Sequence, residues 1–187
     1  MVLEFVVLGV AGVTAIGTVY YYNKIVKLEN RVDNAWAQID VQLKKRADLV
    51  PNLMETVEGY IEHEREIMNN VSQSRERMMN ASSPEEEAQA GNDMGQALKS
   101  LFAVAEDYPD LKASENFKEM QEELSSIENK IAYARQHYND AIMTFNNAIE
   151  TFPAVIFANI FNKSEKNQLQ IETADKELPE VDFSSEE

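Results

Sequence analysis

The stretch SENFKEMQEELSSIENKIAYARQHYNDAIMTFNNAIETFP, residues 114–153, carries the most regular pattern in the chain. Its apolar residues alternate at spacings of three and four, and no charged residue interrupts them: Phe117, Met120, Leu124, Ile127, Ile131, Ala134, Tyr138, Ala141, Phe145 and Ala148. This spacing places one apolar stripe along a helix and is typical of coiled-coil packing. Ser114 suits the N-cap, and Pro153 cannot continue a helix. We therefore predict a helix over 114–150 that packs in a bundle.

Two further apolar stripes lie upstream of this helix. They occupy residues 32–50 and 53–78, and Pro51, which has no backbone N–H to donate, stands between them. Either a kinked helix or a helix–helix turn fits this proline. We favour the turn, because it leaves helices of comparable length at 24–49 and 52–80.

The next helix start is marked by NASSPEEE, residues 80–87. Ser83 can cap the helix, Pro84 takes the first helical position, and Glu86 follows three residues after the serine, as in a capping box. A helix is expected over 84–106, with a connection over 107–114. Helices joined by short loops predict an all-α fold: an N-terminal single transmembrane helix followed by an antiparallel four-helix bundle.

The transmembrane prediction rests on residues 5–22, FVVLGVAGVTAIGTVYYY, which contain no charged side chain. A membrane-spanning helix needs about 20 apolar residues, and tyrosine rings favour the headgroup level. The alternative is a cleaved signal peptide with Ala15-x-Gly17 as a weak cleavage site. The absence of a positive n-region, where Glu4 stands instead, favours an uncleaved anchor at residues 1–23.

The charged residues predict how this anchor is oriented. The chain has 17 basic and 33 acidic residues, and its net charge of −16 disfavours nucleic acid as a partner. Lys24, Lys27 and Arg31 follow the apolar segment, and no Lys or Arg precedes it. The positive-inside rule then predicts a single-pass protein of the cell (inner) membrane, with the N-terminus outside and the domain 24–162 in the cytoplasm.

Few metal sites are possible, because the chain has no Cys and two His. A zinc-protease helix would carry a second histidine four residues after His63, where this chain has Ile67. Di-metal bundles use Glu-x-x-His, but Tyr60 and Ala134 stand three residues before His63 and His137. No serine-nucleophile motif or Gly-rich phosphate loop occurs. We predict no metal, no cofactor and no catalytic residue.

Two other features of the sequence lead to expectations. Glu64 falls in the apolar register of its expected helix (57, 60, 64, 67, 71), and a bundle-edge position is favoured over a buried, partnered carboxylate. From residue 163 the chain is polar and acidic without a periodic apolar face. That composition predicts an acidic disordered tail over 163–187.

The segment FPAVIFANIF, residues 152–161, is almost entirely apolar. In an up-and-down bundle whose first helix leaves the membrane, the fourth helix returns to it, so this segment would reach the bilayer surface. Alternatively it folds back and caps the bundle, and the sequence leaves both possibilities open. The candidate membrane-interface residues are Tyr20, Tyr21, Tyr22, Lys24, Lys27, Phe152, Val155, Ile156, Phe157, Ile160 and Phe161.

Three long stretches resemble the LemA family of bacterial membrane proteins: YYNKIVKLENRVDNAWAQIDVQLKKRADLVPNLMETVEGYIEHE (21–64), YPDLKASENF (108–117) and IENKIAYARQHYNDAIMTFNNAIETFPAVIFANIF (127–161). The resemblance implies a membrane helix followed by a cytoplasmic-side four-helix bundle, with no established activity, cofactor or catalytic residue. It also implies association with membrane-protease or membrane-stress genes, and with magnetosome systems in one branch.

Taken together, these features favour a membrane-anchored interaction scaffold that is not an enzyme. Its expected partners are the lipid bilayer and membrane proteins, with a membrane-protease system suggested by the family association. A lipid-contacting or membrane-shaping protein that uses residues 152–161 is the first alternative. An enzyme is the second, and no motif supports it.

Overall fold

The computed structural model describes residues 1–61 and 64–169. Its helices are α1 (Val2–Glu58), α2 (Arg65–Asn80), α3 (Pro84–Ala105), α4 (Pro109–Ala113), α5 (Glu115–Glu150) and α6 (Ala154–Ile160). Every regular element among these residues is a helix, so the predicted all-α class is confirmed.

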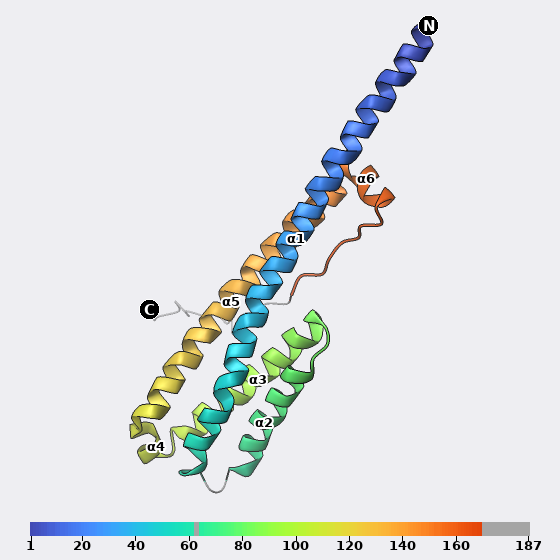
Figure 1. Cartoon of the computed structure of the whole chain (residues 1–187). Coiled ribbons are helices and arrows are strands. Elements are labelled where there is room, and N and C mark those ends of the chain that lie inside the picture. Colours follow the sequence, from blue (N-terminus) through green and yellow to red (C-terminus); the bar gives the residue numbers. More distant parts are fainter. Residues whose placement is uncertain (62–63, 170–187) are drawn as a thin grey trace, which may run out of the picture.

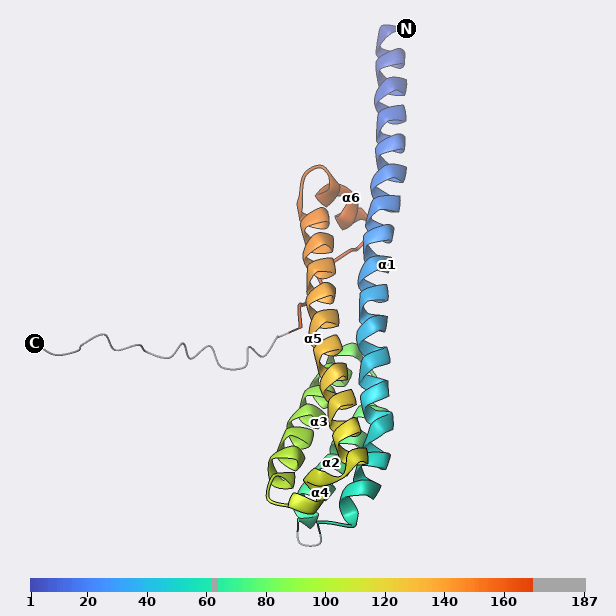
Figure 2. The ribbon, with the colours of Figure 1, turned by 90° about the vertical axis from the view of Figure 1, so that its left-hand side faces the viewer.

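The two longest helices, α1 and α5, lie side by side along the length of the molecule (Figures 1 and 2). α2 and α3 form a hairpin that packs against the C-terminal half of α1. α4 links α3 to α5 at the end of the molecule farthest from the N-terminus. The N-terminal part of α1 projects beyond all the other helices. The predicted arrangement, an N-terminal helix followed by a four-helix bundle, is therefore confirmed. At the end nearest the projecting helix the bundle narrows to α1 and α5.

The core of α5 departs from the predicted heptad positions in its second half. Ala141 and Ala148 are only partly buried, whereas Ile142 and Ile149, one residue further on, are buried. A straight α-helix has 3.6 residues per turn, so a stripe written with a period of 3.5 drifts around it by about 20° per heptad. The drift brings the larger isoleucines toward α1, where they bury more apolar area.

The turn predicted at Pro51 is wrong, because α1 runs through this proline to Glu58. Pro51 cannot donate to the carbonyl of Ala47, four residues earlier. Arg75 of α2 supplies the missing donor, since its Nε lies 2.9 Å from the Ala47 carbonyl oxygen. A tertiary hydrogen bond thus replaces the lost helical one.

The connection between the first two helices instead lies at residues 59–64. Glu64 is the N-cap residue of α2 and is partly exposed, so the prediction that it shares one helical register with Val57 and Val71 is wrong. Val57 belongs to α1 and Val71 to α2, on either side of this connection. His63 lies outside the described residues.

The predicted N-cap of α3 is confirmed, since the backbone N–H of Glu86 donates to Ser83 Oγ at 3.2 Å. The returning bond from the Glu86 carboxylate goes to the backbone N–H of Ser82 at 2.9 Å, one residue earlier than a capping box requires. Ser114 occupies the N-cap position of α5 without a capping bond from its side chain.

Residues 163–169, here called the strap, differ from the tail expected after residue 162. The strap runs in an extended form along α5 toward the hairpin. Lys163 pairs with Glu29 of α1 at 2.5 Å, Lys166 lies 4.0 Å from Asp33, and Leu169 packs against the core. The strap therefore covers a part of the α1–α5 pair that the hairpin of α2 and α3 does not reach. Residues 170–187, the rest of the expected tail, lie outside the described residues.

Candidate functional site

The first candidate site is built on the projecting end of α1. Residues 1–16 are all exposed, although most of them are apolar. Residues 2–22 extend about 31 Å at a rise of about 1.5 Å per residue, close to the roughly 30 Å hydrocarbon core of a bilayer. No part of the apolar window in this helix is buried inside the protein, unlike the core helix of a soluble domain. This helix is therefore a candidate membrane anchor.

α6 lies at the base of the projecting helix and crosses the direction of α5 at 95°. Ala154 and Ala158, one turn apart, are buried and let α6 approach its neighbours closely. The Phe157 ring stacks on Tyr21, with centroids 5.0 Å apart and planes 11° apart. Phe161 meets Tyr22 edge to face, also at 5.0 Å. One face of α6 is thus fixed to the tyrosines of α1.

The opposite face of this segment carries exposed apolar side chains. Phe152, Ile156 and Ile160 are 81%, 50% and 64% exposed. We call these three residues the apolar ridge. No charged residue occurs between 151 and 162, so the ridge has no charged flank on its own segment. An exposed ridge of this kind marks a surface suited to contact with an apolar partner or a bilayer.

The structure brings the other predicted interface residues to the same level of the molecule. Tyr20 is 60% exposed and touches Tyr21 edge to face at 5.1 Å. Lys24 and Lys27 are exposed in the next turns of α1. Val155, Phe157 and Phe161 are partly buried, so these three face the protein more than the ridge does. α6 therefore covers the end of the bundle with one face and leaves its other face open.

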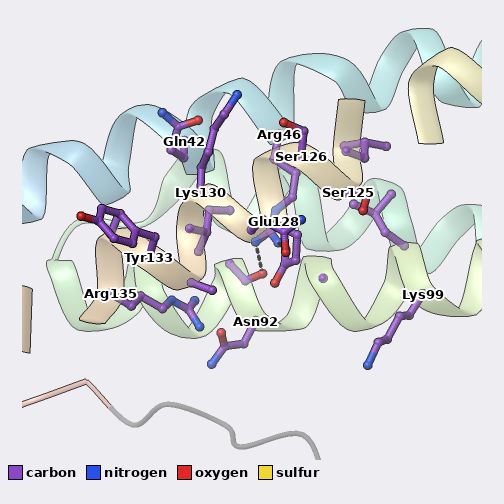
Figure 3. Close-up of a pocket in the computed structure, with 18 of the residues that line it drawn as sticks. Gln42, Arg46, Asn92, Lys99, Ser125, Ser126, Glu128, Lys130, Tyr133 and Arg135 are labelled. Atoms are coloured by element: carbon purple, nitrogen blue, oxygen red, sulfur yellow. Dashed lines mark hydrogen bonds and ion pairs between the residues drawn. The ribbon is translucent and has the colours of Figure 1, made fainter. Parts of the chain in front are cut away.

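A second candidate site, which the sequence analysis missed, centres on Arg46 of α1. Its side chain is only 3% exposed and donates to the Gly91 carbonyl of α3 and to the Glu128 carboxylate of α5 (Figure 3). Burial lowers the pKa of the guanidinium, and the Glu128 carboxylate opposes this shift. Arg46 is spaced three residues after Leu43 and four before Val50, a signal that could have placed it on the buried stripe.

A groove of about 1960 Å³ opens beside this ion pair. Its walls come from α1, α3 and α5. α3 packs mainly on α2 and contacts α5 at few points, such as the edge-to-face pair of Phe102 and Phe117. Leu98, Phe102 and Leu124 give the groove an apolar floor. Six charged side chains surround it, namely Arg46, Lys99, Glu122, Glu128, Lys130 and Arg135. The groove is therefore a basic site within an acidic protein.

Among the residues that the structure describes, no group of three or more His, Cys, Asp or Glu side chains could hold a metal ion. His137 is exposed on α5 and borders a smaller hollow between α1 and α5. The apolar ridge and the groove beside Arg46 are both open surfaces that another molecule can contact.

Comparison with known proteins gives a consistent match. The model of the LemA family matches residues 35–183. "Protein LemA" of Metamycoplasma hominis is 28% identical over 165 residues, which cover 82% of this chain and 74% of that protein. "Magnetosome protein MamQ 1" of Paramagnetospirillum magneticum is 38% identical over 64 residues, and "Magnetosome protein MamQ" of Magnetospirillum gryphiswaldense is 34% identical over the same length. Each of these two matches covers 34% of this chain and 24% of the relative.

Proposed function

This chain belongs to the LemA family, and on that premise we propose that it is a membrane-anchored scaffold whose helical bundle binds other membrane proteins. The proposal rests on one observation above all. α1 is a single helix from the exposed apolar segment to the buried core of the bundle, without a linker between them. A continuous helix fixes the height and direction of the bundle relative to the anchor. Such rigidity suits a protein that presents a surface at a defined distance from the bilayer.

We propose no catalytic step for this protein. The candidate sites combine an apolar ridge with a basic groove, and both are suited to binding. The family association with membrane proteases makes components of such systems the first partners to test.

In-cell crosslinking followed by mass spectrometry tests the scaffold function directly. The full chain should crosslink to a defined set of membrane proteins through lysines of the bundle, such as Lys99 and Lys130, which border the groove. The matched control is the anchor, residues 1–23, fused to an unrelated helical bundle. Recovery of the same set with this control would contradict the proposal.

The proposed location is the inner membrane, with the bundle in the cytoplasm. Lys24 and Lys27, exposed just after the apolar segment, support this orientation. Because the chain has no Cys, Val2→Cys and Ser126→Cys each introduce a single thiol. An impermeant maleimide should label Val2→Cys in intact spheroplasts and Ser126→Cys only after permeabilisation. The reverse labelling pattern would overturn the orientation.

Lipid contact by α6 is a second candidate function, favoured by the apolar ridge. If α1 crosses the bilayer along its axis, a helix at 95° to the adjacent α5 lies nearly parallel to the membrane surface, as interfacial helices do. Trp36 is the single tryptophan, so a Trp36→Phe background allows a reporter at Ile156→Trp. Brominated lipids should quench this reporter more strongly than one at Tyr133→Trp, which is exposed far along α5. Equal quenching at the two positions would exclude lipid contact.

A further inference from the structure

The strap is held to α5 by two asparagine side chains that act as partners for its backbone. The Asn146 amide donates to the Lys166 carbonyl at 2.9 Å and accepts from the Lys166 N–H at 3.0 Å. The Asn139 amide makes the same pair of bonds with Leu169, both at 2.9 Å. Each amide therefore satisfies both backbone groups of one strap residue.

The spacing of these contacts gives the direction and pitch of the strap. Asn139 and Asn146 are seven residues apart on α5, a rise of about 10.5 Å. Their partners Leu169 and Lys166 are three residues apart on the strap, which in an extended chain span about 10 Å. The strap therefore runs antiparallel to α5 and advances three residues for each heptad. Continued at this pitch, residue 172 would meet Ala132 and residue 175 would meet Ser125. Both of these α5 residues line the groove between α3 and α5.

The charges of the groove and of the following segment are opposite. The groove is lined by four basic and two acidic side chains. Residues 170–187 contain seven acidic residues and one lysine, a net charge of 1 − 7 = −6. Close approach of this segment to the groove is therefore electrostatically favourable, whereas most of the protein surface would repel it.

The apolar residues of the groove and of residues 170–187 are also suited to contact with each other. Leu98, Phe102 and Leu124 line the groove, and residues 170–187 include Leu178, Val181 and Phe183. The match to the family model extends to residue 183, beyond the last described residue of the strap. This segment is therefore part of the family pattern rather than an unrelated extension.

We propose that residues 170–187 continue the strap into the groove between α3 and α5 and occupy it within the same molecule. The acidic side chains lie against the basic rim, and the apolar residues cover the floor. The groove is then a docking site for the chain's own C-terminal segment. This inference does not depend on the scaffold function, because it concerns an intramolecular contact.

Crosslinking in the full-length protein, purified in detergent, tests the proposal. Ala174→Cys keeps every charge of the segment and lies one residue before the position expected to meet Ser125. Combined with Ser125→Cys, a short bismaleimide should give an intramolecular crosslink. The matched control is Ala174→Cys with Glu123→Cys, which is exposed on α5 and does not line the groove. We expect a several-fold higher yield for the Ser125 pair.

Salt and a charge reversal add independent readouts. The yield should fall at about 1 M salt, where the Debye length is about 3 Å. Lys99→Glu in the groove should lower the yield, whereas Lys118→Glu, outside it, should not. Asn139→Ala, which removes the last strap contact, should lower the yield without unfolding the bundle. Equal yields for the two cysteine pairs, or crosslinks mainly between molecules, would overturn the proposal.

Discussion

Arg46 is a charged residue placed inside a core whose buried side chains are mostly apolar. Two glycines let α3 approach α1 closely at this point. A Cβ at Gly95 would lie 3.2 Å from an Arg46 guanidinium nitrogen, and one at Gly91 would lie 2.7 Å from Leu43 Cδ2. The arginine thereby joins α1, α3 and α5 through one side chain. In the sequence, Glu64 stands out as the unusual charged residue and Arg46 does not, although Arg46 also has the spacing of a buried stripe. The groups that satisfy Arg46 lie on helices distant in the chain.

Replacing Arg46 with alanine should destabilise the bundle strongly. The change leaves a cavity and an unsatisfied Gly91 carbonyl, which together cost about 2–4 kcal/mol. The Glu128 side chain is 58% exposed, so its carboxylate is solvated after the loss of Arg46 and adds little to the cost. Chemical unfolding followed by circular dichroism measures the loss. Arg65→Ala, at an exposed position in α2, is the control and should change the unfolding free energy by less than about 0.5 kcal/mol. Equal losses for the two variants would refute this role of Arg46.

Pro51 and Arg75 should be coupled energetically. Arg75→Ala removes the donor to the Ala47 carbonyl and should cost about 1–2 kcal/mol. Pro51→Ala restores a backbone N–H to the same carbonyl, so Arg75→Ala should cost less in that background. A double-mutant cycle of unfolding free energies measures the coupling. Additive effects would mean that the Arg75 bond does not compensate for the proline.

Two like charges, Glu165 of the strap and Glu150 of α5, lie close together where the strap passes the C-terminal end of α5. Glu150 is the last residue of α5, and the nearby Glu165 carboxylate raises its pKa, with smaller contributions from a hydrogen bond to Glu165 and from desolvation. A negative charge at a helix C-terminus is also unfavourable for the helix dipole. The strap is therefore held by its lysine and asparagine contacts against a local repulsion.

Glu150→Gln should tighten the strap at neutral pH. A carboxyl group whose folded pKa is raised disfavours the folded state above that pKa, and the penalty disappears as the pH falls below the unfolded pKa. The variant should slow amide hydrogen exchange in residues 164–169 at pH 7 and have no effect below about pH 4. Glu115→Gln, at the opposite end of α5, is the control. Slower exchange at both pH values would contradict the electrostatic explanation.

In the whole molecule, the exposed apolar segment at the N-terminus and the bundle share one helix but no core. The described side chains before residue 17 are exposed, whereas the buried residues of α1 begin at Ile25. Folding of the bundle should therefore not depend on the apolar segment. Membrane attachment should depend on it almost entirely.

Removing residues 2–16 should release the protein from membranes without unfolding it. The truncated chain should keep its helical circular dichroism and its unfolding midpoint, because no buried contact is lost. Ile39→Asp is the opposite control, since it places a charge in the core while keeping the anchor. That variant should unfold but remain in the membrane fraction. A truncated chain that stays in membranes would show that the ridge or another surface suffices for attachment.

Four features could be predicted from the sequence alone: the helical class, the candidate anchor, the cap at Ser83 and the long helix, predicted over 114–150 and found over Glu115–Glu150. These features depend on local properties: periodicity along one helix, hydropathy over one segment, and a hydrogen bond between neighbouring residues. Four others become visible only in the folded molecule: the continuity of α1 through Pro51, the partners of Arg46, the two faces of α6 and the course of the strap. Each of these depends on a partner distant in the chain, such as Arg75 for Ala47 or Asn139 for Leu169. A one-dimensional pattern does not specify which distant residues will meet.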